Sequence, residues 1–247
     1  MHSLLAFLPG SFFPTRCARL PWTCPGRASS GKAAKRRWFA RQISDPFVRQ
    51  AKEEGYRCRS AFKLLQMDSQ FGLLRPGLRV VDCGAAPGSW SQVVVQRVNA
   101  LGVQARPQGV VIGLDLSPID ALPGAIFLDH CDIHNAETQK RVQHFLPGNI
   151  ADVILSDMAP NASGIRQLDQ SNMMLLCYTV LALAESTLQP GGSFLCKLWN
   201  GADAGTLRRH VETLFKDVRQ VKPLASRSES AEIYFVAREY CGQNKVI

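Results

Sequence analysis

The strongest constraint on the fold is a regular alternation of strand-like and helix-like segments between residues 79 and 237. Short apolar segments bounded by turn residues predict strands, and the longer segments between them have the apolar spacing of amphipathic helices. Such alternation is typical of parallel strands connected by right-handed helical crossovers. We therefore predict a single α/β domain with a mainly parallel seven-stranded sheet and helices on both faces.

The predicted strands are residues 79–83, 110–116, 125–128, 151–156, 193–198, 218–221 and 232–237. The predicted helices are residues 47–54 and 60–71 before the sheet, and 89–99, 136–145, 169–188 and 204–215 within it. Asp45 and Pro46 predict a helix start, because an aspartate can accept free N–H groups and proline is tolerated in the first turn. We expect residues 45–240 to form the domain and residues 241–247 a short tail.

The positive charge of the chain is concentrated at its N-terminus. The formal net charge is +9, and residues 1–44 hold eight of the basic side chains and no acidic one, so the rest of the chain carries +1. An arginine-rich, acid-free segment with serines and short apolar patches predicts a mitochondrial transit peptide, cleaved between about residues 18 and 42, and hence a location in the matrix. A basic RNA-binding arm is the alternative interpretation. Since the domain is nearly neutral, any nucleic-acid site on it must be local.

The cysteines and the apolar segments predict neither a metal site nor a membrane span. The eight cysteines form no C-x-x-C pair and have no metal-ligand spacing with the five histidines. The longest apolar stretch, residues 173–184, stops at Glu185 and is too short to cross a bilayer. We expect no membrane insertion, and no feature of the sequence predicts a protein partner.

A loop of small residues follows the first predicted strand and leads into a helix. Glycine and alanine let a ligand approach the backbone closely, and the free N–H groups of the next helix face that ligand. The glycine spacing and the proline disfavour a dinucleotide site, which uses G-x-G-x-x-G. The predicted cofactor-binding residues here are Gly84, Ala85, Ala86, Pro87, Gly88 and Trp90. For Trp90, packing in the core is the alternative interpretation.

Aspartates follow the next two predicted strands. Because parallel strands end at the same edge of a sheet, Asp115 and Asp132 are expected near the small-residue loop. Asp115 is predicted to accept both hydroxyls of a ribose, and Asp132 to meet an adenine amino group. Either aspartate alone could be an ordinary turn residue. Features at three successive strand ends together favour a cofactor that contains a nucleoside.

Five motifs, in order along the chain, resemble the FtsJ family of RNA 2′-O-methyltransferases. They are RSAFKL at 59–64, GAAPGSWSQ at 84–92, SDMAPN at 156–161, PGGSF at 190–194 with Lys197, and SR at 226–227 with EIY at 232–234. The resemblance extends over about residues 45–237 and implies a Rossmann-like class I methyltransferase domain that uses S-adenosylmethionine. Together with the basic leader, it implies 2′-O-methylation of a ribose, on a uridine, in mitochondrial large-subunit ribosomal RNA within an assembling particle.

The resemblance also implies a reaction centre, which it carries onto Lys63, Asp157, Lys197 and Glu232. Lys197 is the expected base; an isolated lysine is protonated near neutral pH, so this role needs burial and a second cation such as Lys63. Asp157 would orient Lys197 and lie near the positive end of the cofactor, and Glu232 would anchor the lysines or the substrate ribose. That Lys197 only steers the hydroxyl, with late proton loss, remains open. Taken singly, each of these residues could be an ordinary surface charge.

Two positions depart from the family pattern. Ser89 stands where the family usually has a second glycine, and Cys83 where leucine is common. Serine is small and starts helices well, so we expect cofactor binding to be retained. Candidate cations for RNA phosphates are Lys52, Arg57, Arg59, Arg166, Arg208, Arg209, Lys222 and Arg227.

Three other functions compete with ribosomal RNA methylation. A transfer RNA or cap 2′-O-methyltransferase would share the reaction centre. A ribosome-assembly factor could keep the fold without turnover, although the intact lysines and carboxylates argue against it. A nicotinamide oxidoreductase is disfavoured by the small-residue loop.

Overall fold

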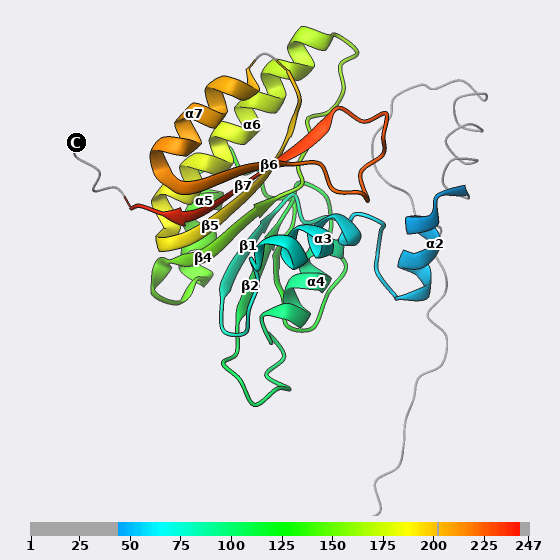
Figure 1. Cartoon of the computed structure of the whole chain (residues 1–247). Coiled ribbons are helices and arrows are strands. Elements are labelled where there is room, and N and C mark those ends of the chain that lie inside the picture. The colour runs from blue at the N-terminus through cyan, green and yellow to red at the C-terminus, as the bar shows by residue number, and fades with distance from the viewer. Residues whose placement is uncertain (1–43, 202, 243–247) are drawn as a thin grey trace, which may run out of the picture.

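Seven strands of the described chain form one sheet in the order β3-β2-β1-β4-β5-β7-β6 (Figure 1). The computed structural model describes residues 44–201 and 203–242. The strands from β1 to β5 pair in parallel, and β7 runs antiparallel to both β5 and β6. The predicted mainly parallel seven-stranded sheet is confirmed. The strands are β1 (Arg79–Cys83), β2 (Val110–Leu114), β3 (Ile126–Leu128), β4 (Ala151–Ser156), β5 (Leu188–Trp199), β6 (Phe215–Val221) and β7 (Glu232–Tyr240).

Helices cover both faces of the sheet. In Figure 1, α5, α6 and α7 lie on one face, α3 and α4 lie on the other, and α2 lies beyond α3 at one end of the molecule. None of the helices in the described ranges is long and apolar enough to cross a membrane. Their bounds are α2 (Pro46–Glu53), α3 (Ala61–Phe71), α4 (Ser89–Arg97), α5 (Ala136–Phe145), α6 (Arg166–Thr187) and α7 (Ala204–Leu214), with a 3₁₀ turn at Pro147–Asn149.

The core consists of two apolar layers separated by the sheet. Side chains alternate between the faces of a strand, so Val80 and Val153 pack in the layer under α3 and α4, whereas Val81 and Ile154 pack in the layer under α5, α6 and α7. All four side chains are buried. The central strands are therefore apolar on both faces, as expected for parallel strands covered by helices.

The start of α2 follows the prediction, and several other boundaries differ from it; β5, for example, begins at Leu188 and not at residue 193. Asp45 caps α2 by accepting the Phe47 N–H at 3.1 Å. Helix α6 begins three residues before Asp169, because the Asp169 carboxylate binds the N–H and hydroxyl of Ser163 in the preceding loop. Residue Phe215 was expected to end a helix but begins β6, where its buried ring lies against Tyr240. The predicted leader, apart from Ser44, lies outside the described residues, as does the tail beyond residue 242.

One ion pair joins the starts of β1 and β4, at the edge of the sheet away from their carboxyl ends. Arg79 Nε lies 2.8 Å from Asp152 Oδ2, and Nη2 lies 3.0 Å from Oδ1. We expect Asp152→Ala to lower the free energy of unfolding by about 2 kcal/mol, because it leaves a mostly buried guanidinium without its partner. Urea unfolding measures this. Glu212→Ala, which removes an exposed ion pair with Arg208, is the control and should change the free energy of unfolding little. An equal loss of stability in the two variants would contradict the prediction.

Candidate active site

The four predicted reaction-centre residues come from four different elements. Lys63 lies on α3, Asp157 directly follows β4, Lys197 lies in β5, and Glu232 begins β7. In the ladder between β5 and β7, Lys197 pairs with Tyr234. The fold thus brings residues from distant parts of the chain to the carboxyl-end edge of the sheet, where ligands bind in open α/β sheets.

Two lysines and two carboxylates form a compact cluster at this edge. Lys63 Nζ lies 2.8 Å from Glu232 Oε1 and 2.9 Å from Oε2, and Lys197 Nζ lies 3.0 Å from Asp157 Oδ1. Lys63 Nζ is also 3.9 Å from that Asp157 oxygen, and Lys197 Nζ donates to the Asp157 main-chain carbonyl. Both lysines are buried. Because the opposite charges balance, the cluster can exist away from water.

Tyr234 links the two halves of the cluster. Its hydroxyl donates to Asp157 Oδ1 at 2.6 Å and accepts from Lys63 Nζ at 3.2 Å, and its side chain is fully buried. Burial and then the charges of Asp157 and Glu232 raise the pKa of Tyr234 well above its ordinary value, so the phenol remains a donor at neutral pH. Sequence reasoning missed Tyr234 as a site residue. The signal was available: it lies two residues after Glu232, on the same side of the strand.

The charges around Asp157 determine its protonation. Burial alone would raise the pKa of Asp157, but the ammonium groups of Lys197 and Lys63, with hydrogen bonds from Tyr234 and Lys197, outweigh burial and lower it below the ordinary value. Asp157 is therefore ionised at neutral pH. It is the carboxylate that holds both lysines and the phenol together.

A second buried aspartate lies next to the small-residue loop. Asp82 is fully buried in β1, and its Oδ2 accepts the hydroxyl of Ser91 at 2.7 Å. Burial raises the pKa of Asp82 to about 7. The negative charges of Asp157 and Asp115 also raise it, and the hydrogen bond from Ser91 lowers it only in part. Its Oδ1 has no hydrogen-bond partner within the described part of the chain. A buried polar atom without a partner is rare in folded proteins, and a role in a functional site is one explanation for it.

The loop between β1 and α4 is shaped by glycines. Gly84 and Gly88 have φ values of +78° and +103°, which favour glycine. A Cβ on Gly84 would lie 2.3 Å from Met158 Cγ, and a Cβ on Gly88 would lie 2.3 Å from Arg57 Nη1, so side chains there would collide with their surroundings. Beside the loop, the unpartnered Oδ1 of Asp82 and the carboxylate of Asp115 are polar groups that fit a small cofactor with polar groups of its own.

The remaining predicted cofactor residues lie in different settings. Asp115 follows β2 and binds the loop, accepting the Ala86 N–H at 3.0 Å and the Ser117 N–H at 2.7 Å. Asp132 is exposed after β3 and accepts the His134 N–H at 2.9 Å in a turn. Their contacts with a cofactor stay predictions.

Trp90 lies in the core beneath the loop. Only 2% of it is exposed, its indole N–H donates to the Ser60 carbonyl at 2.8 Å, and its ring centroid is 6.0 Å from that of Tyr234. This position favours the core-packing interpretation of Trp90. Ser89, the departure from the family pattern, is buried, with its hydroxyl 3.1 Å from that of Ser60. Within the described ranges, no group of three or more metal-ligating side chains is arranged to hold an ion.

The fold and the site point to one class of enzyme, because a buried cluster of lysines and carboxylates lies beside a glycine-lined loop on a sheet of this strand order. That class is the methyltransferases. The chain belongs to the FtsJ-like methyltransferase family, which it matches over residues 56–240. All four predicted reaction-centre residues and the loop lie within that range.

Individual relatives agree with this family. The chain is 44% identical to "rRNA methyltransferase 2, mitochondrial" of Drosophila melanogaster, across 90% of this chain and 88% of that protein. It is 42% identical to "Ribosomal RNA large subunit methyltransferase E" of Jannaschia, across 88% of this chain and 92% of that protein. A solved structure of a ribosomal RNA methyltransferase from Plasmodium falciparum superposes with a TM-score of 0.67 at 26% identity, covering 76% of this chain and all of that one.

Tyr234→Phe tests the link within the cluster. The change keeps the ring but removes the hydroxyl that joins Asp157 and Lys63, so we expect the methyl-transfer rate to fall about tenfold, the size of one lost hydrogen bond to a charged group. Single-turnover kinetics measure this. Tyr240→Phe removes a hydroxyl that donates to the Glu185 carbonyl, where β7 ends, and is the matched control. An unchanged rate for Tyr234→Phe would contradict the role.

The lowered pKa of Asp157 predicts a pH dependence of stability. A carboxyl whose pKa is lower in the folded state stabilises the protein fully above its unfolded pKa, about 4, and loses that contribution as the pH falls through the folded value. We expect wild type to be more stable than Asp157→Asn near pH 6, with the gap narrowing below about pH 4. Urea unfolding across this range measures the gap. A gap that does not depend on pH would contradict the prediction.

Proposed function

We propose that this protein transfers a methyl group from S-adenosylmethionine to the 2′-hydroxyl of a ribose, on a uridine, in mitochondrial large-subunit ribosomal RNA. The observation that carries the proposal is the buried cluster of Lys63, Asp157, Lys197, Glu232 and Tyr234 beside the glycine-lined loop. The names of the relatives support a ribosomal RNA substrate, and that of the Drosophila relative supports a mitochondrial location.

The loop residues Gly84, Ala85, Ala86, Pro87 and Gly88 would hold the cofactor against the backbone. Asp115 would accept the hydroxyls of its ribose, and Asp132, exposed after β3, would accept its adenine amino group. When bound, S-adenosylmethionine supplies an electrophilic methyl group on a positively charged sulfur. Asp157, which is ionised, would favour that positive charge nearby.

Lys197 would hold the ribose oxygen in line for transfer. In the ion pair with Asp157, Lys197 takes part as an ammonium group. In that form Lys197 can donate a hydrogen bond to the hydroxyl oxygen and orient it, whereas accepting the hydroxyl proton requires that Lys197 first lose one of its own. Lys63 and Glu232, paired through both carboxylate oxygens, would fix the wall of the site that faces the substrate.

The basic leader would direct the chain to the mitochondrial matrix, and the substrate there would be RNA within an assembling large subunit. The domain has no appended RNA-binding module in the described ranges, which favours recognition of a structured site. A non-catalytic assembly factor is the second candidate, because the same fold could bind the particle without turnover.

Methyl transfer to defined RNA tests the proposal. Leaderless protein would be incubated with tritiated S-adenosylmethionine and large ribosomal particles from depleted mitochondria, or with their free RNA. We expect label on one ribose, and a rate about 10²- to 10⁴-fold lower for Lys197→Ala, because the group proposed to hold the reacting oxygen would be lost. Lys140→Ala, an exposed lysine on α5, is the control for loss of a positive charge.

The outcomes separate the candidates. Label that maps to a 2′-oxygen and is lost only in Lys197→Ala supports the proposed reaction. Absence of label on both particles and free RNA contradicts it. A Lys197→Ala variant that lacks activity but restores assembly in depleted cells would show that binding has a function of its own.

A further inference from the structure

A polar pocket adjoins the reaction centre on the side of the segment between β6 and β7. Its volume is about 360 Å³, and its lining includes Arg59, Lys63, Arg227, Glu229, Ser230 and Glu232. Lys63 and Glu232 are thus shared between the pocket and the cluster. A substrate whose ribose reaches Lys197 would have a neighbouring group in this pocket.

Most of the basic side chains that are candidates for RNA binding already contact other groups of the protein. Lys222 donates to the carbonyls of Ser228 and Ser230, and Arg57 to those of Pro87 and Ala121. On α7, Arg208 pairs with Glu212, and Arg209 donates to Thr206. The side chains of Arg57, Lys222, Arg208 and Arg209 therefore hold local structure.

Two arginines line the pocket, and their surroundings differ. Arg59 is held by an ion pair with Asp45, by the Ala225 carbonyl, and over the Phe47 ring. Among the described residues, Arg227 has one ion pair, with Nη2 3.5 Å from Asp45 Oδ2, and its side chain is 32% exposed. Asp45 therefore orients Arg227, while the rest of that guanidinium has no partner in the described part of the chain. Arg227 is the pocket cation that is available for a ligand.

In the described part of the chain, no ion pair joins Arg227 to Glu229 or Glu232; its ion pair is with Asp45. Glu232 is held by Lys63 through both oxygens. Glu229 is exposed to solvent and accepts the hydroxyl of its neighbour Ser228. Arg227, which is less exposed than Glu229 and is paired with Asp45, can meet an anion that enters the pocket.

The covalent structure of RNA identifies that anion. The carbon next to the one that carries the 2′-hydroxyl carries the 3′-oxygen, so the 3′-phosphate is the charged group closest to the reacting oxygen. Resting on the proposed function, we propose that Arg227 binds the phosphate on the 3′ side of the methylated ribose. A guanidinium is well suited to this because it can donate two parallel hydrogen bonds to phosphate oxygens.

RNA binding and methyl transfer, measured separately, test this role. For Arg227→Ala we expect a dissociation constant for the RNA about tenfold higher, a KM for RNA raised in parallel, and an unchanged KM for S-adenosylmethionine. The slope of log binding constant against log salt should decrease by about 0.7, the value for one single-strand phosphate contact. Arg227→Lys should restore the slope and part of the affinity, because it restores the charge without the two-pronged geometry.

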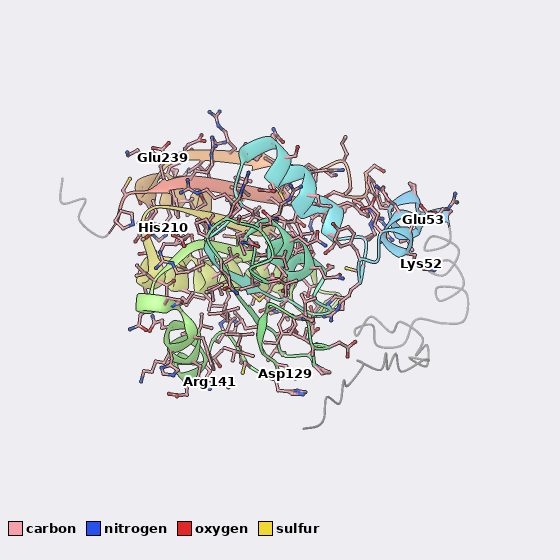
Figure 2. All side chains as sticks on the ribbon, turned by 90° about the horizontal axis from the view of Figure 1, so that it is seen from below. Lys52, Glu53, Asp129, Arg141, His210 and Glu239 are labelled. Atoms are coloured by element: carbon pink, nitrogen blue, oxygen red, sulfur yellow. The ribbon has the colours of Figure 1, made fainter. Side chains whose placement is uncertain are left out.

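Lys216→Ala is the matched control. It removes the same charge from the start of β6, at the end of that strand away from the segment that contains Arg227, and Lys216 Nζ lies 3.6 Å from Glu239. Figure 2 shows Glu239 at the end of the molecule opposite Lys52 and Glu53 of α2, the helix that Asp45 caps. Thermal unfolding of both variants checks that neither change disturbs the fold.

Each outcome gives a decision. The assignment is supported if Arg227→Ala binds RNA more weakly and with a smaller salt slope, while Lys216→Ala changes neither the affinity nor the slope. Unchanged binding, an equal loss in both variants, or a loss of rate without a change in KM for RNA overturns it. If wild-type protein binds the RNA but transfers no methyl group, the proposed function fails, and the binding data still decide on Arg227.

Discussion

The balance of charge among Lys63, Glu232, Asp157 and Lys197 is the constraint on which the rest of the structure depends. Burying an ammonium group is costly unless a carboxylate lies against it, and here each lysine has one within 3.0 Å. The four residues come from α3, the end of β4, β5 and β7, so the cluster forms only when all four elements are in place. The antiparallel β7, inserted between β5 and β6, is what brings Glu232 and Tyr234 to the edge where the parallel strands end.

The sheet could be predicted from sequence because its central strands obey a simple rule. Val80, Val81, Val153 and Ile154 are apolar on both faces, as parallel strands between two helical layers must be. The prediction was weaker where contacts between distant residues set the boundary. Phe215 belongs to an amphipathic pattern along the chain, yet its packing against Tyr240 places it in a strand. Local periodicity contains no information about such a partner.

The site, like the fold, could be predicted from the sequence only in part. The motifs identified the residues that the fold gathers, and the structure brings Lys63, Asp157, Lys197 and Glu232 into contact. Motifs do not say which neighbours complete the geometry. The hydroxyl of Tyr234 and the buried carboxyl of Asp82 became visible only as hydrogen-bond partners and as altered pKa values. Trp90, predicted from its place after the loop, is buried against Tyr234, and its contact with a cofactor stays a prediction.

The charge count of the cluster bears on how Lys197 can act. Two ammonium groups, two carboxylates and a neutral phenol give no net charge in the described state. The charge of Lys197 balances that of Asp157. A steering role for Lys197 needs only the ion pair that the structure already contains, whereas a role as base would also require that Lys197 give up the charge that balances Asp157.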